Sequence, residues 1–159
     1  MKEYLKLEKK FIEDSKWGVF LSNCSKAWIK QTLNQEISKF QLISSWIVRQ
    51  FKNEYNPIHT HGGHLSGVGY LKVPKSFGEY HQKTKVSNQN GLLTLVHGTR
   101  TFMSESTYNV APKVGDFYFF PNYLMHTVYP VTGTDDERRS VSFNAFIDDD
   151  IYNVFKPKK

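Results

Sequence analysis

The chain has 159 residues, of which 39% are hydrophobic and 15% are aromatic, and its formal net charge is +6. This length suits one domain with a proper core, and no apolar run is long enough to cross a membrane. Cys24 is the single cysteine, which excludes an internal disulfide and a cysteine-based zinc site. We therefore expect one domain over residues 1–159, without a secretory signal, in a reducing, cytoplasmic setting.

The N-terminal quarter of the chain predicts one helix. Residues 1–20 mix charged and apolar side chains and predict an irregular lead-in or an edge strand. Residues 22–40 predict a helix because their apolar side chains recur near helical spacing, and Ser22 or Ser25 can cap it. The recurring side chains are Trp28, Leu33, Ile37 and Phe40.

From residue 44 onward the sequence changes to short apolar runs separated by turn signals, which predicts a β-core over about 44–147. The predicted strands cover residues 44–51, 64–73, 91–96, 117–120, 126–129 and 138–147. Gly67 and Gly69 mark a place where another backbone or a ligand comes close. One helix followed by many short strands is typical of a mainly β protein, a sandwich or jelly roll.

Three of the six histidines fall within the six residues 59–64. In an extended segment, residues i and i+2 face the same side, so His59 and His61 can hold one metal ion, whereas His64 faces away. His126, far downstream, is the candidate third ligand, because distant strands meet across a jelly roll. Three protein ligands leave coordination positions open for a substrate. The alternative is that these are ordinary polar histidines of loops or the core.

Arg138 and Ser140 share one face of the last predicted strand, and Arg139 should face the other way. A guanidinium holds a carboxylate through two parallel hydrogen bonds, and a neighbouring hydroxyl can add a third. The hydroxyl of Tyr70 could reach the same carboxylate. The alternatives are a surface Arg138 that pairs with the acidic residues 135–137, and a Tyr70 that belongs to the core.

The order of these motifs resembles the iron(II)/2-oxoglutarate-dependent oxygenases, most closely a small branch from bacteria and tailed phages. The motifs lie between about Trp46 and Phe146 and are His59-Thr60-His61, Leu65-Ser66-Gly67-Val68-Gly69-Tyr70-Leu71, Gly115-Asp116-Phe117-Tyr118-Phe119-Phe120-Pro121 with His126 after it, and Arg138-Arg139-Ser140-Val141-Ser142-Phe143-Asn144. The resemblance implies a double-stranded β-helix, which is a cupin-like jelly roll, with the N-terminal helix packed on it.

The resemblance also implies His59 and His126 as iron ligands, and Arg138, assisted by Ser140 and Tyr70, as the holder of 2-oxoglutarate. Such enzymes use O2 to convert 2-oxoglutarate to succinate and CO2 while they hydroxylate a protein, a nucleobase or a metabolite. No catalytic residue is then expected beyond the metal centre. A phage-encoded member would act in the host cytoplasm.

One position departs from the usual pattern of two histidines and one carboxylate, because His61 stands where the carboxylate is expected. Either His61 binds the iron in a three-histidine site, or water takes its place; the His-x-His pattern of the small branch favours His61 as a ligand.

Two other functions fit parts of the sequence. One is a cupin-like three-histidine metal enzyme that does not use 2-oxoglutarate, and the other is a non-catalytic phage-type binding protein that acts through its Lys-rich surface. Arg138 and Ser140 distinguish the first alternative, which has no need of them. We expect the polar segments 74–90 and 96–111 to border the mouth of the active site.

Overall fold

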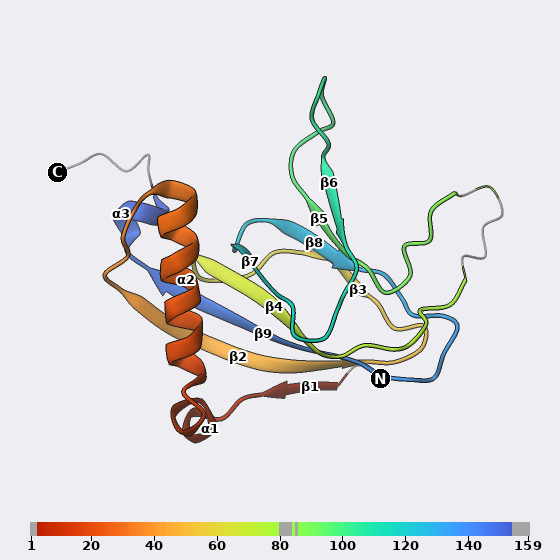
Figure 1. The fold of residues 1–159 in the computed structure, drawn as a ribbon, viewed down its shortest axis with the longest axis horizontal. Coiled ribbons are helices and arrows are strands. Elements are labelled where there is room, and N and C mark those ends of the chain that lie inside the picture. The colour runs from red at the N-terminus through yellow and green to blue at the C-terminus, as the bar shows by residue number, and fades with distance from the viewer. Residues whose placement is uncertain (1–2, 80–83, 85, 154–159) are drawn as a thin grey trace.

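The computed structural model describes residues 3–79, 84 and 86–153 of the chain (Figure 1). The elements in this part of the chain are β1 (Glu3–Lys6), α1 (Lys9–Asp14), α2 (Trp17–Leu33), β2 (Phe40–Gln50), β3 (Asn56–His59), β4 (Leu65–Lys72), β5 (Leu93–Val96), β6 (Thr107–Val110), β7 (Phe117–Pro121), β8 (Met125–Val128), β9 (Arg138–Ile147) and α3 (Asp149–Tyr152). The chain is therefore mainly β, as the turn-separated apolar runs predicted.

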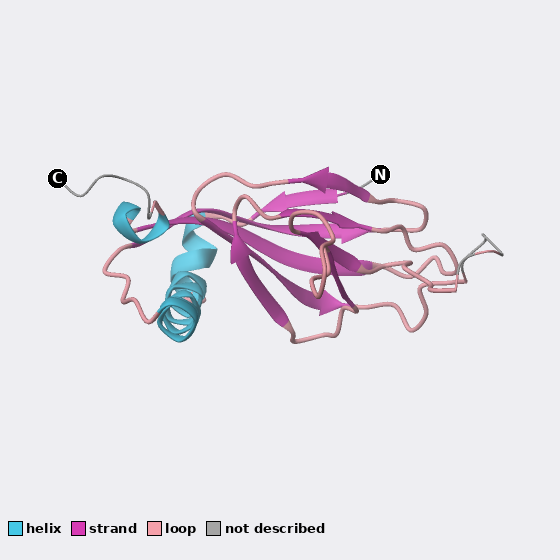
Figure 2. Cartoon of the chain, turned by 90° about the horizontal axis from the view of Figure 1, so that it is seen from above, coloured by secondary structure: helices cyan, strands magenta, loops and turns pink. Residues whose placement is uncertain are grey.

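The strands form two antiparallel sheets, which Figures 1 and 2 show from two sides. The five-stranded sheet has the order β1-β2-β9-β4-β7, and the four-stranded sheet has the order β3-β8-β5-β6. Apolar side chains from both sheets pack into one buried cluster, which includes Val68, Leu93, Phe120 and Val128. This arrangement confirms the predicted jelly roll, and β1 is an edge strand, as expected for the lead-in.

A second apolar cluster joins helix α2 to the outer face of the five-stranded sheet. Leu21 and Ile29 of the helix pack with Phe143, Ala145 and Ile147 of β9. These three β9 residues alternate along the strand, so β9 presents one apolar face to the helix and leaves its other face to the space between the sheets. The expected helix on a β-core is confirmed.

The helix bounds differ from the predicted 22–40, because α2 begins at Trp17 and ends at Leu33. Asn34 follows in the left-handed conformation with φ 52°, which is a common way to end a helix. The apolar spacing misled the prediction because Ile37 and Phe40, which lie beyond the helix, pack against the same cluster. No helix in the described part of the chain is long and apolar enough to cross a membrane.

Most predicted strands are confirmed within a few residues, and β9 has the predicted bounds. Gly67 and Gly69 of β4 accept close neighbours. The expected approach of another backbone occurs at Gly67, where an added Cβ atom would lie 2.7 Å from Tyr118 O, and the other neighbours are aromatic rings. A Cβ atom on Gly67 would lie 2.7 Å from the Phe143 ring, and one on Gly69 would lie 2.3 Å from the Phe117 ring. The two glycines therefore allow the aromatic layer under α2 to lie directly on the sheet.

Glu137 fixes the orientation of β9 at its first residues. Arg139 donates hydrogen bonds from Nε and Nη2 to both carboxylate oxygens of Glu137, at 2.7 and 2.8 Å, and Arg49 Nε donates to Oε1 at 2.8 Å. Arg49 and Arg139 are paired across β2 and β9. These contacts hold Arg139 on the outer face, so the alternation of the strand directs Arg138 inward.

The Glu137 ion pairs predict a pH-dependent stability. Bonding from Arg139, aided by Arg49, lowers the pKa of Glu137 from 4.5 to about 2. A carboxylate with a depressed folded-state pKa stabilises the protein above its unfolded pKa, and this stabilisation is lost as the pH falls from 4.5 toward 2. We expect Glu137→Gln to lower the free energy of unfolding by about 2 kcal/mol at pH 7, after allowance for the partly exposed arginines.

Urea unfolding measured between pH 7 and pH 3 checks this expectation, and the gap between wild type and Glu137→Gln should narrow as the pH falls. Asp135→Asn is the matched control, because Asp135 is exposed and its pair with Lys52 is worth little. An equal gap at pH 7 and pH 3 would contradict the assigned role of Glu137.

Candidate functional site

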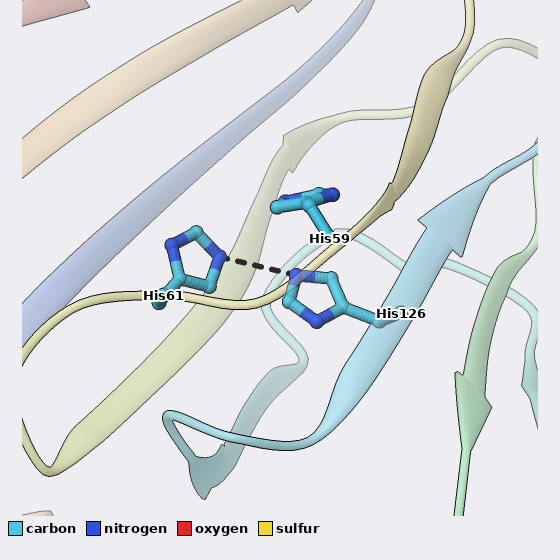
Figure 3. A group of neighbouring side chains, drawn as sticks. All are labelled: His59, His61 and His126. Carbon is cyan, nitrogen blue, oxygen red and sulfur yellow. Dashed lines mark hydrogen bonds between the residues drawn. The ribbon is translucent and has the colours of Figure 1, made fainter.

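Three histidines meet at one edge of the space between the sheets (Figure 3). His59 ends β3, and His126 lies in β8, and these two residues are directly paired across the strands. One ring nitrogen of each of His59, His61 and His126 lies within 4.8 Å of the others. The structure thus brings together the three histidines that the sequence singled out.

The separations suit ligands of one metal ion. His61 Nε2 lies 3.1 Å from His126 Nε2. Two imidazoles bound to one ion at about 2.0–2.1 Å place their nitrogens about 3–3.5 Å apart. The three side chains therefore fit a facial set of nitrogen donors.

His61 reaches the site by a different route from the predicted strand, because β3 ends at His59 and the chain turns at Gly62 and Gly63. Instead, the His61 N–H donates to Asn122 O at 2.9 Å, and Asn122 Nδ2 donates to His61 O at 3.2 Å. The His61 ring also lies 5.6 Å from the Trp46 ring. The backbone contacts with Asn122 and the contact with Trp46 place His61.

Backbone carbonyls orient two of the rings. His126 Nδ1 lies 2.9 Å from Leu124 O, and His59 Nδ1 lies 2.6 Å from Pro57 O. A protonated Nδ1 that donates to a carbonyl leaves the lone pair of Nε2 free for a metal, which is the usual outer contact of a histidine ligand. In each case the carbonyl belongs to the residue two positions earlier.

The half-buried His61 ring and the buried His126 ring are neutral at physiological pH. Burial, followed by the repulsion of His126 and His59, lowers the pKa of His61 to about 4. Burial also lowers the pKa of His126 to about 4, against the opposing effect of its hydrogen bond to Leu124. Neutral imidazole is the form that binds a metal. Protons therefore compete with a metal ion for the ring nitrogens of His61 and His126 only at acidic pH.

His64 lies away from this group, as predicted, although the chain turns at Gly62 and Gly63 and does not continue as a strand. It stacks on Tyr152 with the ring centres 4.0 Å apart, and the backbone N–H of Ile147 donates to its Nδ1 at 3.2 Å. Asp149 lies 3.6 Å from its Nε2. His64 thus joins the end of β9 to α3 and has a structural role.

The three histidines open into a cavity of about 230 Å³ between the two sheets. The residues that line it are Tyr4, Trp46, Val48, Gln50, Asn56, His59, His61, Val68, Leu93, Phe120, His126, Val128, Arg138, Ser140 and Ser142. Arg138 is the one formally charged side chain among them. Of segments 74–90 and 96–111, which we expected to border the mouth of the active site, no described residue is in the cavity lining, and residues 80–83 and 85 lie outside the described residues.

Strand register explains how residues far apart in sequence share this cavity. Gln50 is paired with Arg138 at one end. The next cavity-facing row along the sheet consists of Tyr4, Val48, Ser140 and Tyr70, and the row after it contains Trp46, Ser142 and Val68. Trp46 in turn contacts His61. Ser140 and Ser142 therefore lie on β9 between Arg138 and the level of the histidines.

Arg138 is a buried cation with unused donors. Its exposed fraction is 2%, and burial lowers the pKa of its guanidinium. Nη1 donates to Gln50 Oε1 at 3.2 Å, whereas Nε and Nη2 are buried without a hydrogen-bond partner among the described residues. Nε–H and Nη2–H form one edge of the guanidinium, the fork that binds a carboxylate.

The acidic residues near Arg138 in sequence do not neutralise it. Glu137 bonds Arg139 and Arg49, Asp136 accepts from Lys72 Nζ at 2.6 Å, and Asp135 lies 3.4 Å from Lys52 Nζ. Each acid of this run thus contacts a base other than Arg138. The alternative of a surface arginine paired with residues 135–137 is wrong.

Tyr70 lies beside Arg138 in the core. The guanidinium carbon is 5.0 Å from the centre of the Tyr70 ring, a cation–π contact. The Tyr70 hydroxyl is buried and, within the described part of the chain, has no hydrogen bond of good geometry, but it lies close enough to the Arg138 guanidinium for each group to shift the pKa of the other. Burial raises the pKa of Tyr70, so the hydroxyl is a neutral donor. Tyr70 is not one of the cavity-lining residues, and Ser140 is.

The sequence did not single out Gln50, Trp46 or Tyr4 as site residues. Gln50 is the last residue of β2. Tyr4 belongs to the edge strand β1, and its ring stacks on the Trp46 ring with the ring centres 5.7 Å apart. These positions follow from the pairing of β1, β2 and β9, which local sequence patterns do not specify. A buried amide at the end of an apolar strand was the available signal for Gln50.

Comparison with known proteins agrees with this geometry. Residues 44–144 match the sequence model of a family described as "Putative 2OG-Fe(II) oxygenase". No curated protein matches the chain. The matched segment contains the three histidines, Tyr70, Arg138 and Ser140, and it begins in β2 and ends in β9.

Solved structures with a similar fold include the following three proteins. An oxidoreductase of the 2OG-Fe(II) oxygenase family from Burkholderia pseudomallei has a TM-score of 0.61 and 11% identity, over 91% of this chain and 65% of that chain. A Pseudomonas putida prolyl-4-hydroxylase has a TM-score of 0.59 and 16% identity, over 92% of this chain and 69% of that chain. HygX from Streptomyces hygroscopicus, with nickel and 2-oxoglutarate bound, has a TM-score of 0.59 and 12% identity, over 90% of this chain and 71% of that chain. The chain thus spans roughly two thirds of the length of these proteins.

The three-histidine geometry predicts that His61→Ala lowers the affinity for the metal by about 10- to 100-fold, because one of three nitrogen donors is lost. Anaerobic calorimetry with Fe(II) at pH 7 measures this affinity. His97→Ala is the matched control, because His97 is exposed and is absent from the group of three. Unchanged Fe(II) affinity in His61→Ala would mean that water takes the third position.

Proposed function

The chain belongs to the 2OG-Fe(II) oxygenase family, and on this premise we propose that it is an Fe(II)- and 2-oxoglutarate-dependent dioxygenase that hydroxylates a substrate. In this proposal His59, His61 and His126 hold the iron, and Arg138, Ser140 and Tyr70 bind 2-oxoglutarate. Bound iron and 2-oxoglutarate supply the activation of O2 and the oxidation that yields succinate and CO2. The protein residues bind and orient these groups and shield them from water.

The observation that carries the proposal is the unpaired fork of Arg138 in the same cavity as the three histidines. A buried cation without a charged partner costs several kcal/mol, and a carboxylate that accepts from Nε and Nη2 offsets that cost. The three histidines are neutral donors and add no negative charge. A dianionic ligand that contacts both the metal and Arg138 therefore matches the charge of the site.

The positions of Ser140 on β9 and of Tyr70 on the neighbouring strand β4 support their proposed roles. Ser140 follows Arg138 on the cavity face toward the histidines, so its hydroxyl lies along the path of a ligand that joins the two ends. The unpaired Tyr70 hydroxyl lies with its ring against Arg138 and offers a further donor to the same carboxylate. Nε, Nη2 and this hydroxyl are three neighbouring buried donors, and none has a hydrogen bond of good geometry to another described residue.

The cupin-like alternative needs the three histidines but not a buried guanidinium with an open fork, so the state of Arg138 favours 2-oxoglutarate. A non-catalytic binding protein needs neither feature. O2 and an as yet unidentified protein, nucleobase or metabolite complete the set of reactants that we propose. The absence of a possible internal disulfide accords with the cytoplasm as the proposed location.

The Arg138 assignment predicts that Arg138→Met lowers the affinity for 2-oxoglutarate about 100-fold or more, because two hydrogen bonds from a charged donor are lost. Anaerobic calorimetry on the Fe(II)-loaded protein measures the affinity, and succinate release under O2 measures turnover. Arg139→Met is the matched control, because Arg139 lies on the outer face with Glu137. Wild-type protein that binds Fe(II) but not 2-oxoglutarate would overturn the proposal in favour of the cupin-like alternative.

A further inference from the structure

We infer that Gln50 is a positioning residue that aims the carboxylate-binding edge of Arg138 into the cavity, an inference that rests on the proposed function. Gln50 lies directly opposite Arg138 in the β2–β9 pairing and lines the same cavity. Its side chain is the hydrogen-bond acceptor of Arg138 Nη1, at 3.2 Å. It acts on 2-oxoglutarate through Arg138.

The amide of Gln50 can adopt only one orientation. Its Nε2 donates to Glu54 O at 2.6 Å and to Tyr129 O at 3.3 Å, so both of its hydrogens point to backbone carbonyls. An amide nitrogen has two hydrogens, and the oxygen must then face the opposite way, toward Arg138. The backbone thus fixes the acceptor before any ligand binds.

A fixed acceptor on Nη1 also fixes the plane of the guanidinium. The five N–H groups of arginine form a rigid fork, so bonding on one nitrogen sets the direction of the other two. The Tyr70 ring lies against the guanidinium with its centre 5.0 Å from Cζ, which limits tilting. Nε and Nη2 are the donors that remain without partners. Gln50 and Tyr70 therefore leave free the edge that holds a carboxylate side-on.

The chemistry of an amide suits this task better than that of a carboxylate. Glutamate at position 50 would accept from Arg138 in the same way but would also neutralise it and repel an incoming anion. Glutamine orients the guanidinium and leaves its full positive charge for the ligand. No aspartate or glutamate occurs among the described residues that line the cavity, which fits this need.

Gln50 also connects the two ends of the site. Tyr129, whose carbonyl accepts from Gln50, directly follows β8, the strand that carries His126. The amide thus joins the five-stranded sheet, which carries Arg138, to the four-stranded sheet, which carries His59 and His126. The separation between the guanidinium and the metal, which a ligand must span, depends on this link.

The test compares two ligands that differ only in the distal carboxylate. Binding of 2-oxoglutarate and of 2-oxopentanoate to the Fe(II)-loaded protein is measured by anaerobic calorimetry for wild type, Gln50→Met and Gln50→Glu. We expect Gln50→Met to lower the affinity for 2-oxoglutarate about tenfold and to leave that for 2-oxopentanoate unchanged. Gln50→Glu should lower the affinity for 2-oxoglutarate further, because its charge occupies Arg138.

Asn90→Leu is the matched control. Asn90 is likewise a buried amide whose nitrogen donates to backbone carbonyls, those of Phe77 and Glu79, but it lies outside the cavity lining. Its loss should lower thermal stability without changing the preference between the two ligands. Equal weakening of both ligands in Gln50→Met, or no weakening of either, overturns the role of Gln50. A wild-type protein that does not prefer 2-oxoglutarate overturns the proposed function itself.

Discussion

The burial of Arg138 without an anionic partner is the constraint on which the rest of the site depends. A buried unpaired charge is costly, and the structure offsets only part of that cost, through one hydrogen bond to Gln50 and the face of the Tyr70 ring. The nearby acids are held by Lys52, Lys72, Arg49 and Arg139 and do not reach it. The protein therefore keeps two donors of a cation directed at a cavity, an arrangement whose natural complement is a carboxylate.

Strand β9 makes this arrangement possible, because one of its faces packs against the helix and the other lines the cavity. Phe143, Ala145 and Ile147 form the face that packs under α2, while Arg138, Ser140 and Ser142 face the cavity. A shift of the register by one residue would exchange these faces and place Arg139 inside. The apolar packing under the helix and the bonding of Arg139 to Glu137 on the outside oppose such a shift. The packing of α2 on the sheet and the inward direction of Arg138 and Ser140 thus come from the same alternation.

Sequence periodicity predicted the parts of the structure that depend on one strand at a time. The bounds of β9, the inward Arg138 and the outward Arg139 all follow from a period of two. His64 also lies away from the three histidines, as predicted, but because the chain turns at Gly62 and Gly63 and not because of strand alternation. The end of α2 was missed because Ile37 and Phe40 continue the apolar pattern after Asn34 has ended the helix. Gln50, Trp46 and Tyr4 were missed because their place in the site depends on which strands pair and in which register, and this is a property of the whole sheet.

The replacement of the usual carboxylate by His61 can be understood from what surrounds it. The rings of Trp46 and Phe120 lie 5.6 and 6.4 Å from the His61 ring, so this position has aromatic neighbours that favour a neutral side chain. A carboxylate here would lose water on the side of these rings, whereas an imidazole packs against them and still offers Nε2. The low pKa of His61 follows from the same burial. In the proposed three-histidine site no ligand would offset the charge of a bound divalent ion, so the attraction of this end of the cavity for an anion would add to that of Arg138 at the other end.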